Sequence, residues 1–150
     1  MQTSATLSDT ALSPIQPLHL QIPAVREKLP EVVELMVAYS GEAGWNQELS
    51  TLIDLVLEEL LINIIDYGYP DRPAGTIQLT VESQADSVCI HLLDDGIPFD
   101  PFLYEMPDQG LSLQERTLGG LGLYLVKSLV DNWHYQYSNG NNRSVITKNI

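Results

Sequence analysis

Apolar residues recur along this chain at two different spacings, and these spacings predict its helices and strands. Over residues 47–67 they follow the three- and four-residue steps of a helix with a wide apolar face. Another helix is expected over 24–40, with Pro30 marking either a bend or a later start and with Gly41 and Gly44 breaking it. A third helix begins at Gly120 and contains the apolar positions Leu123, Leu125, Val126, Leu129 and Val130.

Alternation of apolar and polar residues predicts strands elsewhere. The expected strands cover residues 18–22, 76–82, 88–93, 133–137 and 144–148. A turn at Ala85-Asp86 joins the second strand to the third, and Asn139-Gly140-Asn141-Asn142 joins the last two. The resulting fold class is α+β, a two-layer sandwich whose mixed, mostly antiparallel sheet is covered on one face by helices.

Two segments fall outside this pattern. Residues 1–17 are rich in Ser, Thr, Gln and Pro, which predicts a flexible N-terminal tail before a single domain over residues 18–150. Residues 94–118 have no clear periodicity and contain several prolines. A stretch of this length inside a compact domain predicts a functional loop or a lid.

Charge narrows the possible functions. The 20 acidic residues and 7 Lys and Arg give a formal net charge of −13, which argues against a nucleic-acid or anionic-membrane surface because phosphate contacts need clustered cations. A polyanionic ligand must therefore arrive with Mg²⁺ and meet backbone dipoles or the few cations.

Without a secretory signal or a membrane-spanning stretch, a cytoplasmic protein is expected. The lone Cys89 is expected to be a small buried residue.

Three short segments carry candidate chemistry, and the first lies on the longest predicted helix. Glu59 and Asn63 are four residues apart and project from one face of it. The Asn63 carboxamide suits Mg²⁺, and the Glu59 carboxylate is suited to activating a nucleophile beside a terminal phosphate. The alternative is that both belong to the solvated face of the helix.

The second segment begins where an apolar strand ends. Asp94 is suited to accept a hydrogen bond from the exocyclic amine of adenine, which favours ATP over GTP. Gly96 has no Cβ and lets the base approach the backbone. An Asp-Asp-Gly turn without a ligand is the alternative.

The third segment, Gly119-Gly120-Leu121-Gly122, opens the last predicted helix. Exposed amides at a helix N-terminus, together with the helix dipole, form an anion site. A flexible hinge with tight helix packing is the alternative. Arg116 is the cation best placed in the sequence to touch phosphate.

Together these segments resemble a known family. The stretches EELLINIIDYGYPD, LLDDGIPFDP and GGLGLYLVKSLVDNWHYQYSNGNNRSVITK are similar to the Bergerat-type ATP-binding fold shared by DNA gyrase B, the chaperone Hsp90, histidine kinases and MutL. Within that group the chain is most similar to the anti-sigma factor serine/threonine kinases of bacterial stress and sporulation control. The resemblance covers about residues 18–148.

The resemblance implies ATP and Mg²⁺ as cofactors and a serine on an anti-sigma-factor antagonist protein as the phosphoacceptor. It also implies sequestration of a sigma factor or other regulator, and a homodimer. The matching positions are Glu59 for the catalytic base, Asn63 for the Mg²⁺ ligand, Asp94 for the adenine-reading carboxylate with Gly96 beside it, and Gly120 and Gly122 for the phosphate-facing glycines.

Three departures from the family pattern leave two functions open. Tyr67 stands where sporulation-type members often have His, and Pro98 stands where the second box usually has its second Gly. The lid between Asp100 and Gly119 carries only one cation, Arg116. The first function is a protein kinase, and the second is an ATP- or ADP-binding module that switches partners without phosphotransfer.

A third function, the catalytic domain of a histidine kinase, is disfavoured. Such a protein needs a helical hairpin that carries a phosphoacceptor histidine. The three histidines, His19, His91 and His134, do not lie in the predicted helices.

Overall fold

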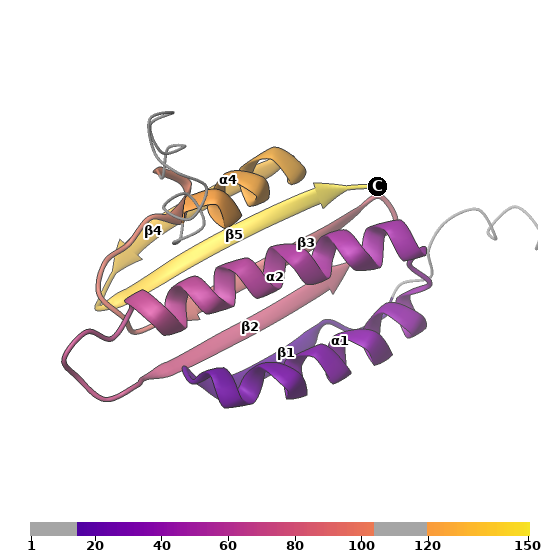
Figure 1. Ribbon diagram of the computed structural model, residues 1–150. Coiled ribbons are helices and arrows are strands. Elements are labelled where there is room, and N and C mark those ends of the chain that lie inside the picture. Colours follow the sequence, from indigo (N-terminus) through magenta and orange to yellow (C-terminus); the bar gives the residue numbers. More distant parts are fainter. Residues whose placement is uncertain (1–14, 104–119) are drawn as a thin grey trace, which may run out of the picture.

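The computed structural model describes residues 15–103 and 120–150, which form two layers (Figure 1). One layer is a five-stranded sheet with the order β1-β2-β3-β5-β4, in which each neighbouring pair is antiparallel, so the described sheet is purely antiparallel and not mixed as expected. The strands are β1 (Leu18–Pro23), β2 (Thr76–Ser83), β3 (Ser87–Asp94), β4 (Asn132–Ser138) and β5 (Asn141–Asn149). The helices are α1 (Leu29–Ala43), α2 (Gln47–Tyr67) and α4 (Gly120–Leu129), with short 3₁₀ turns at Arg26–Lys28 and Pro101–Leu103.

The core lies between the helices and one face of the sheet, as the alternating pattern predicts. In β2 and β3 every second residue is buried, because successive side chains of a strand point to opposite faces. Helix α2 crosses the middle of the sheet between α1 and α4 (Figure 1). The largest side chains with almost no exposed surface are Met36, Ile53, Leu61, Ile77, Leu79, Ile90, Leu92 and Ile146.

The expected boundaries of the first helix are corrected at both ends. Pro30 marks a later start, since α1 begins at Leu29 and Pro30 occupies its first turn, where a missing N–H costs no helical hydrogen bond. The helix continues through Gly41 to Ala43, and of the two expected breaking glycines it is Gly44, with a φ of 75°, that closes it. Helix α2 has the predicted bounds, and the Asn46 side chain caps it by accepting a hydrogen bond from Leu49 N at 2.8 Å.

The closing hairpin has a shorter turn than expected. Asn139 and Gly140 have φ values of 54° and 80°, which suits the tight two-residue turn that Asn-Gly favours. Asn141 and Asn142 therefore belong to β5 rather than to the turn. The tighter turn places Asn142 opposite Asp94 on β3.

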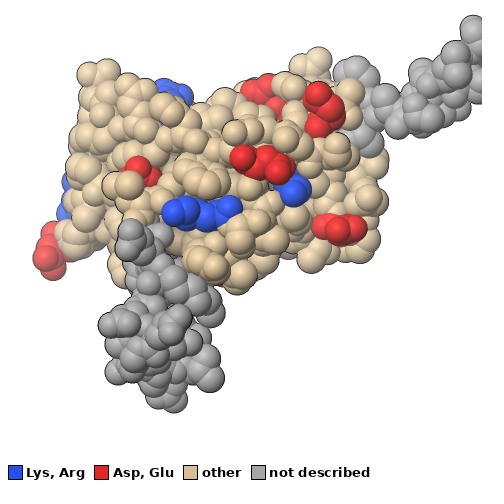
Figure 2. All heavy atoms as spheres, turned by 90° about the horizontal axis from the view of Figure 1, so that it is seen from above, with Lys and Arg blue, Asp and Glu red and all other residues tan. Residues whose placement is uncertain are grey.

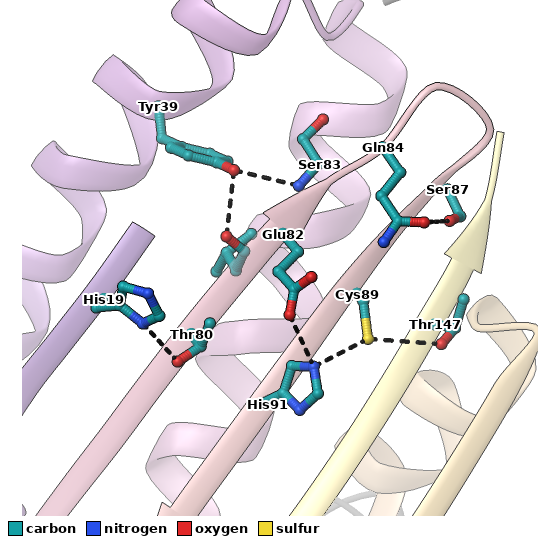
Figure 3. Close-up of polar contacts among 11 residues, drawn as sticks. His19, Tyr39, Thr80, Glu82, Ser83, Gln84, Ser87, Cys89, His91 and Thr147 are labelled. Atoms are coloured by element: carbon teal, nitrogen blue, oxygen red, sulfur yellow. Dashed lines mark hydrogen bonds and ion pairs between the residues drawn. The ribbon is translucent and has the colours of Figure 1, made fainter. Parts of the chain in front are cut away.

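The other face of the sheet has no helix over it among the described residues, and polar side chains line it. His19, His91 and His134 occupy one row across the strands. His91 Nε2 lies 3.3 Å from Glu82 Oε1 and 3.3 Å from the Cys89 thiol (Figure 3). The expectation that Cys89 is buried is therefore wrong, because the residue points to this open face and is only partly covered. The partial cover over Cys89 is still enough to raise the pKa of its thiol.

Among the described residues, none of the helices is both long and apolar enough to cross a membrane. The face of the molecule in Figure 2 carries scattered acidic and basic side chains, and one basic group lies directly beside an acidic one. Lys148 lies 3.6 Å from Asp131, and the Lys127 ammonium lies 5.8 Å from the centre of the Trp133 ring. These two cations thus have local partners.

Residues 1–14 and 104–119 lie outside the described part of the chain. The predicted tail and most of the predicted lid fall there, so both stay predictions.

Candidate nucleotide-binding site

Helix α2 presents the first predicted pair at its C-terminal half. Asn63 is buried, with 8% of its surface exposed, and Glu59 is half-buried one turn earlier. Neither is on a solvated helix face, so that alternative is wrong. Within the described part of the chain, no hydrogen bond engages the Asn63 carboxamide. A buried amide normally has a partner, so this one is suited to an additional ligand.

The Glu59 carboxylate lies against the start of α4. A Cβ added to Gly122 would lie 1.8 Å from Glu59 Oε2, so this position accepts only glycine unless Glu59 moves. Burial raises the pKa of Glu59, and the charge of Glu58 raises it further. The fold thus brings the first and third predicted segments together, and it holds a carboxylate with an increased proton affinity where they meet.

Asp94 ends β3 inside the structure, with only 6% of its surface exposed. Its Oδ1 accepts hydrogen bonds from Gly96 N at 2.9 Å and from Asn142 Nδ2 at 2.9 Å. No hydrogen bond of the described residues uses Oδ2. Burial raises the pKa of Asp94, while the two hydrogen bonds act in the opposite direction. The arrangement leaves one carboxylate oxygen available to a donor such as an exocyclic amine.

Gly96 is required by close packing of two backbone segments. A Cβ there would lie 2.9 Å from Gly68 O and 2.9 Å from Asp94 Oδ1. Ile97 N donates to Gly68 O at 2.9 Å, so the loop after β3 is joined to the end of α2. The sequence predicted that the missing Cβ of Gly96 lets a base approach. The structure shows that the missing Cβ also lets the backbone at Gly68 pack closely against Gly96.

Asp95, the acid that follows Asp94, stabilises the structure beside the site. Asp95 Oδ1 accepts from Tyr69 Oη at 2.7 Å and from Thr76 N at 3.0 Å. The hydrogen bond from Tyr69 is the main cause that lowers the pKa of Asp95. Asp95 therefore holds the loop after α2 in place, while Asp94 points into the site.

Asn142 is a functional candidate that the sequence analysis missed. Its Nδ2 donates to Asp94 Oδ1 and, at 2.9 Å, to Ile97 O. Its Oδ1 accepts from Phe99 N at 3.1 Å and from the Tyr135 hydroxyl. One buried carboxamide therefore positions the Asp94 carboxylate and the loop that follows it.

The geometry of the closing turn was the signal from which Asn142 could have been predicted. A two-residue Asn139-Gly140 turn leaves Asn141 and Asn142 in the strand, where the alternation with Ser144 and Ile146 directs Asn142 inward. An inward polar residue opposite a strand-terminal acid predicts a buried hydrogen bond.

The space enclosed by these groups is small. Its volume is about 20 Å³, which is room for a water molecule but not for a purine. The rim is more exposed, with Tyr67 at 49% and Ile97 at 38%. The lining residues are Leu60, Asn63, Ile64, Tyr67, Gly68, Leu92, Asp94, Ile97, Phe99, Pro101, Asn142 and Ser144.

The remaining predicted site residues are described only in part. Arg116 and Gly119 lie outside the described residues. Gly120 is the first residue of α4, and of Leu121 only the helical backbone is described. The predicted phosphate contacts of these residues therefore stay predictions.

The layered fold, the acid at the end of β3 and the polar pair on the central helix can now be compared with known proteins. The family model of the histidine kinase-like ATPase domain matches residues 22–148. The chain belongs to this family.

Named relatives give a narrower likeness. The serine/threonine-protein kinase BtrW of Bordetella bronchiseptica is 31% identical over 104 residues, which cover 69% of this chain and 72% of that protein. The serine-protein kinase RsbW of Listeria monocytogenes is 26% identical over 129 residues, covering 81% and 80%. The anti-sigma F factor of Clostridium beijerinckii is 25% identical over 96 residues, covering 64% and 67%. The predicted resemblance to the anti-sigma factor kinases is confirmed.

A solved structure supports the fold. The crystal structure of the RsbU and RsbW domains of a Mycobacterium tuberculosis protein superposes with a TM-score of 0.61 at 16% identity. The match spans 91% of this chain and 33% of that longer chain. The two-layer α+β class predicted from the sequence is confirmed.

We expect Asn142→Ala to lower the free energy of unfolding by about 1–3 kcal/mol, because it removes a donor from the buried Asp94 carboxylate. Urea denaturation measures the loss. Asn141→Ala is the matched control, since its side chain makes one exposed hydrogen bond, to Asn139 O. Equal losses in the two variants would contradict the assigned role.

The raised pKa of Asp94 predicts a pH dependence of stability. A carboxyl whose pKa is higher in the folded state binds protons more strongly there, so it lowers stability as pH rises through its titration range. Asp94→Asn removes this effect, and the variant should gain stability relative to the wild type between about pH 3 and pH 7. Asp86→Asn in the exposed β2–β3 turn is the control. A relative stability of Asp94→Asn that stays flat or falls over this range would refute the prediction.

Proposed function

We propose that this protein is a Mg-ATP-dependent serine/threonine protein kinase of the partner-switching type. It phosphorylates a serine on a small antagonist protein and sequesters a regulatory partner. The observation that carries the proposal is the half-buried Glu59, whose pKa is raised, beside Gly122 and one turn from the buried Asn63. A site that only binds nucleotide has no need for a carboxylate of this kind.

The residues fit Mg-ATP in three respects. The Asn63 carboxamide is buried without a hydrogen bond in the described part, Asp94 keeps one oxygen open, and Gly122 lets the start of α4 reach Glu59. Among the described residues there is no cluster of three or more His, Cys, Asp or Glu side chains that could hold a metal ion. A Mg²⁺ site with few protein ligands, completed by phosphate oxygens and water, is therefore the kind that suits Asn63.

Each residue then has a distinct task. Asp94 binds the adenine amine, and Gly96 allows the close approach. Asn63 holds Mg²⁺. When bound, ATP would supply its terminal phosphoryl group: the serine Oγ bonds to the terminal phosphorus, the bond from that phosphorus to the bridging oxygen breaks, and ADP leaves with that oxygen. Glu59 accepts the proton of the serine hydroxyl, and its raised pKa suits a general base.

The phosphate contacts complete the proposed site. The amides of Gly119, Gly120, Leu121 and Gly122 at the start of α4 face the phosphates, and Arg116 adds the local cation. In a chain with a net charge of −13, these donors must offset repulsion of the polyanionic nucleotide.

The proposed partners follow the names of the relatives, which include serine-protein kinases and an anti-sigma factor. We propose an anti-sigma-factor antagonist as the substrate and a sigma factor or similar regulator as the sequestered partner. We further propose a homodimer that acts in the cytoplasm. The domain that does this is proposed to span residues 18–150.

A second candidate is an ATP- or ADP-binding module that switches partners without phosphotransfer. Pro98 favours it, because proline restricts the loop directly after Gly96 where the family usually has glycine. Glu59 argues against it, since adenine and Mg²⁺ binding do not need that carboxylate. Measurements of nucleotide binding and of transfer separate the two candidates.

Mg-ATP is expected to raise the thermal midpoint of the wild type by roughly 5–10 °C at about a hundredfold excess over the Kd. Asp94→Asn should lose most of this shift because the carboxylate that reads the amine is gone, and Asn63→Ala should lose the part that depends on Mg²⁺. Differential scanning fluorimetry with ATP, ADP and GTP measures the shift of the thermal midpoint, and Asp86→Asn is the control variant. If millimolar nucleotide leaves the wild type unchanged, the proposed site is wrong.

Glu59→Gln is expected to reduce phosphotransfer by about a hundredfold or more and to leave the ATP affinity nearly unchanged. Radiolabelled ATP and a candidate antagonist protein measure transfer, and calorimetry measures affinity. Glu48→Gln changes an exposed acid in the first turn of α2, away from Glu59 and from the groove between α1 and α2, and serves as the control. Loss of ATP affinity in Glu59→Gln would contradict the role of base. Equal rates in Glu59→Gln and the wild type would overturn the catalytic assignment.

A further inference from the structure

A groove between α1 and α2 lies on the flank of α2 away from the nucleotide site. Its volume is about 220 Å³, which exceeds the cavity of about 150 Å³ that accommodates benzene in an engineered protein core. Helical periodicity separates the two sites, because Asp54, Glu58 and Leu61 face α1 whereas Glu59 and Asn63 face the other side. A molecule in the groove therefore leaves the nucleotide site free.

The groove is apolar inside and along its α1 rim. Met36 and Leu61 line it and are almost fully buried. Val33 and Val37, one turn apart on α1, are 55% and 62% exposed, and Val33 lines the groove. Together these residues offer an apolar strip along a helix, which suits side chains that repeat every three or four residues.

The α2 rim is acidic and lacks cations. Helices α1 and α2 contain eight acidic residues and no Lys or Arg. Asp54 and Glu58 line the groove one turn apart, and no ion pair within the described residues involves either of them. Burial and the charge of Glu58 raise the pKa of Asp54, so an approaching cation would stabilise both carboxylates.

Charge also decides between a second copy and a different partner. A second copy that docked the same face would place its own acidic α1 and α2 against these acids, and like charges across an interface are unfavourable. A cationic partner removes this conflict and relieves the repulsion between Asp54 and Glu58.

We propose that the α1–α2 groove docks one amphipathic helix of a partner protein. Aliphatic side chains at positions i, i+3 or i+4 and i+7 of that helix fill the groove, and flanking Lys or Arg residues pair with Asp54 and Glu58. This inference rests on the partner-binding part of the proposed function and not on phosphotransfer. It is tested without nucleotide, so its failure and that of the kinase assignment are distinguishable.

The test uses a helical peptide of about 18 residues with Leu at i, i+3, i+4 and i+7 and Lys at flanking positions. A scrambled peptide of the same composition controls for charge alone. Calorimetry gives the affinity, and methyl NMR of the full chain locates the contact. We expect tighter binding of the amphipathic peptide than of the scrambled one, with the largest shifts at Val33, Met36 and Leu61.

Two charge variants make the test specific. Asp54→Lys/Glu58→Lys should weaken binding by about tenfold or more. Glu34→Lys/Glu42→Lys changes the net charge equally at exposed positions of α1 that do not line the groove, and should weaken it far less. All four acids are exposed, and circular dichroism confirms folding.

Three results would overturn the proposal. The first is equal affinity for the two peptides, and the second is equal weakening by the two charge variants. The third is a dimer in sedimentation that Val33→Asp disrupts, which would assign the groove to a second copy.

Discussion

One buried hydrogen bond, from the Asn142 carboxamide to the Asp94 carboxylate, supports the architecture of the whole site. It connects the ends of β3 and β5 on the face that the helices cover. The same carboxamide binds the backbone at Ile97 and Phe99, so the loop after β3 cannot shift without disturbing Asp94. A carboxylate in an apolar layer is costly unless donors surround it, and Asn142 and Gly96 meet that need.

The proposed nucleotide site and the proposed docking groove both follow from the position of α2. This helix buries one face on the sheet and exposes two flanks, one toward α4 and one toward α1. The flank toward α4 carries Glu59 and Asn63, and the flank toward α1 carries Asp54 and Glu58. Because one rigid helix serves both flanks, a partner in the groove and a nucleotide in the site contact the same element from opposite sides. If both are occupied, α2 provides a direct physical connection between them.

Local patterns were sufficient for most of the fold. The strands, helix α2 and the α4 start were predicted because alternation and helical periodicity are set by side-chain direction within each element. The errors arose where neighbouring elements decide the outcome. Helix α1 continues through Gly41 because the apolar residues after it still pack on the core, and Cys89 is only partly covered because helices occupy one face alone.

By itself the sequence determined the element types, the helix-facing sides of the strands and three segments of candidate chemistry, since these depend on composition and spacing along the chain. Only the tertiary structure decided that Glu59 meets Gly122 and that Asn142 holds the Asp94 carboxylate in place. Those outcomes depend on the register of β3 and β5 and on the packing of α2 against α4. Spacing within one element sets which side chains share a face, but packing between elements sets which side chains meet.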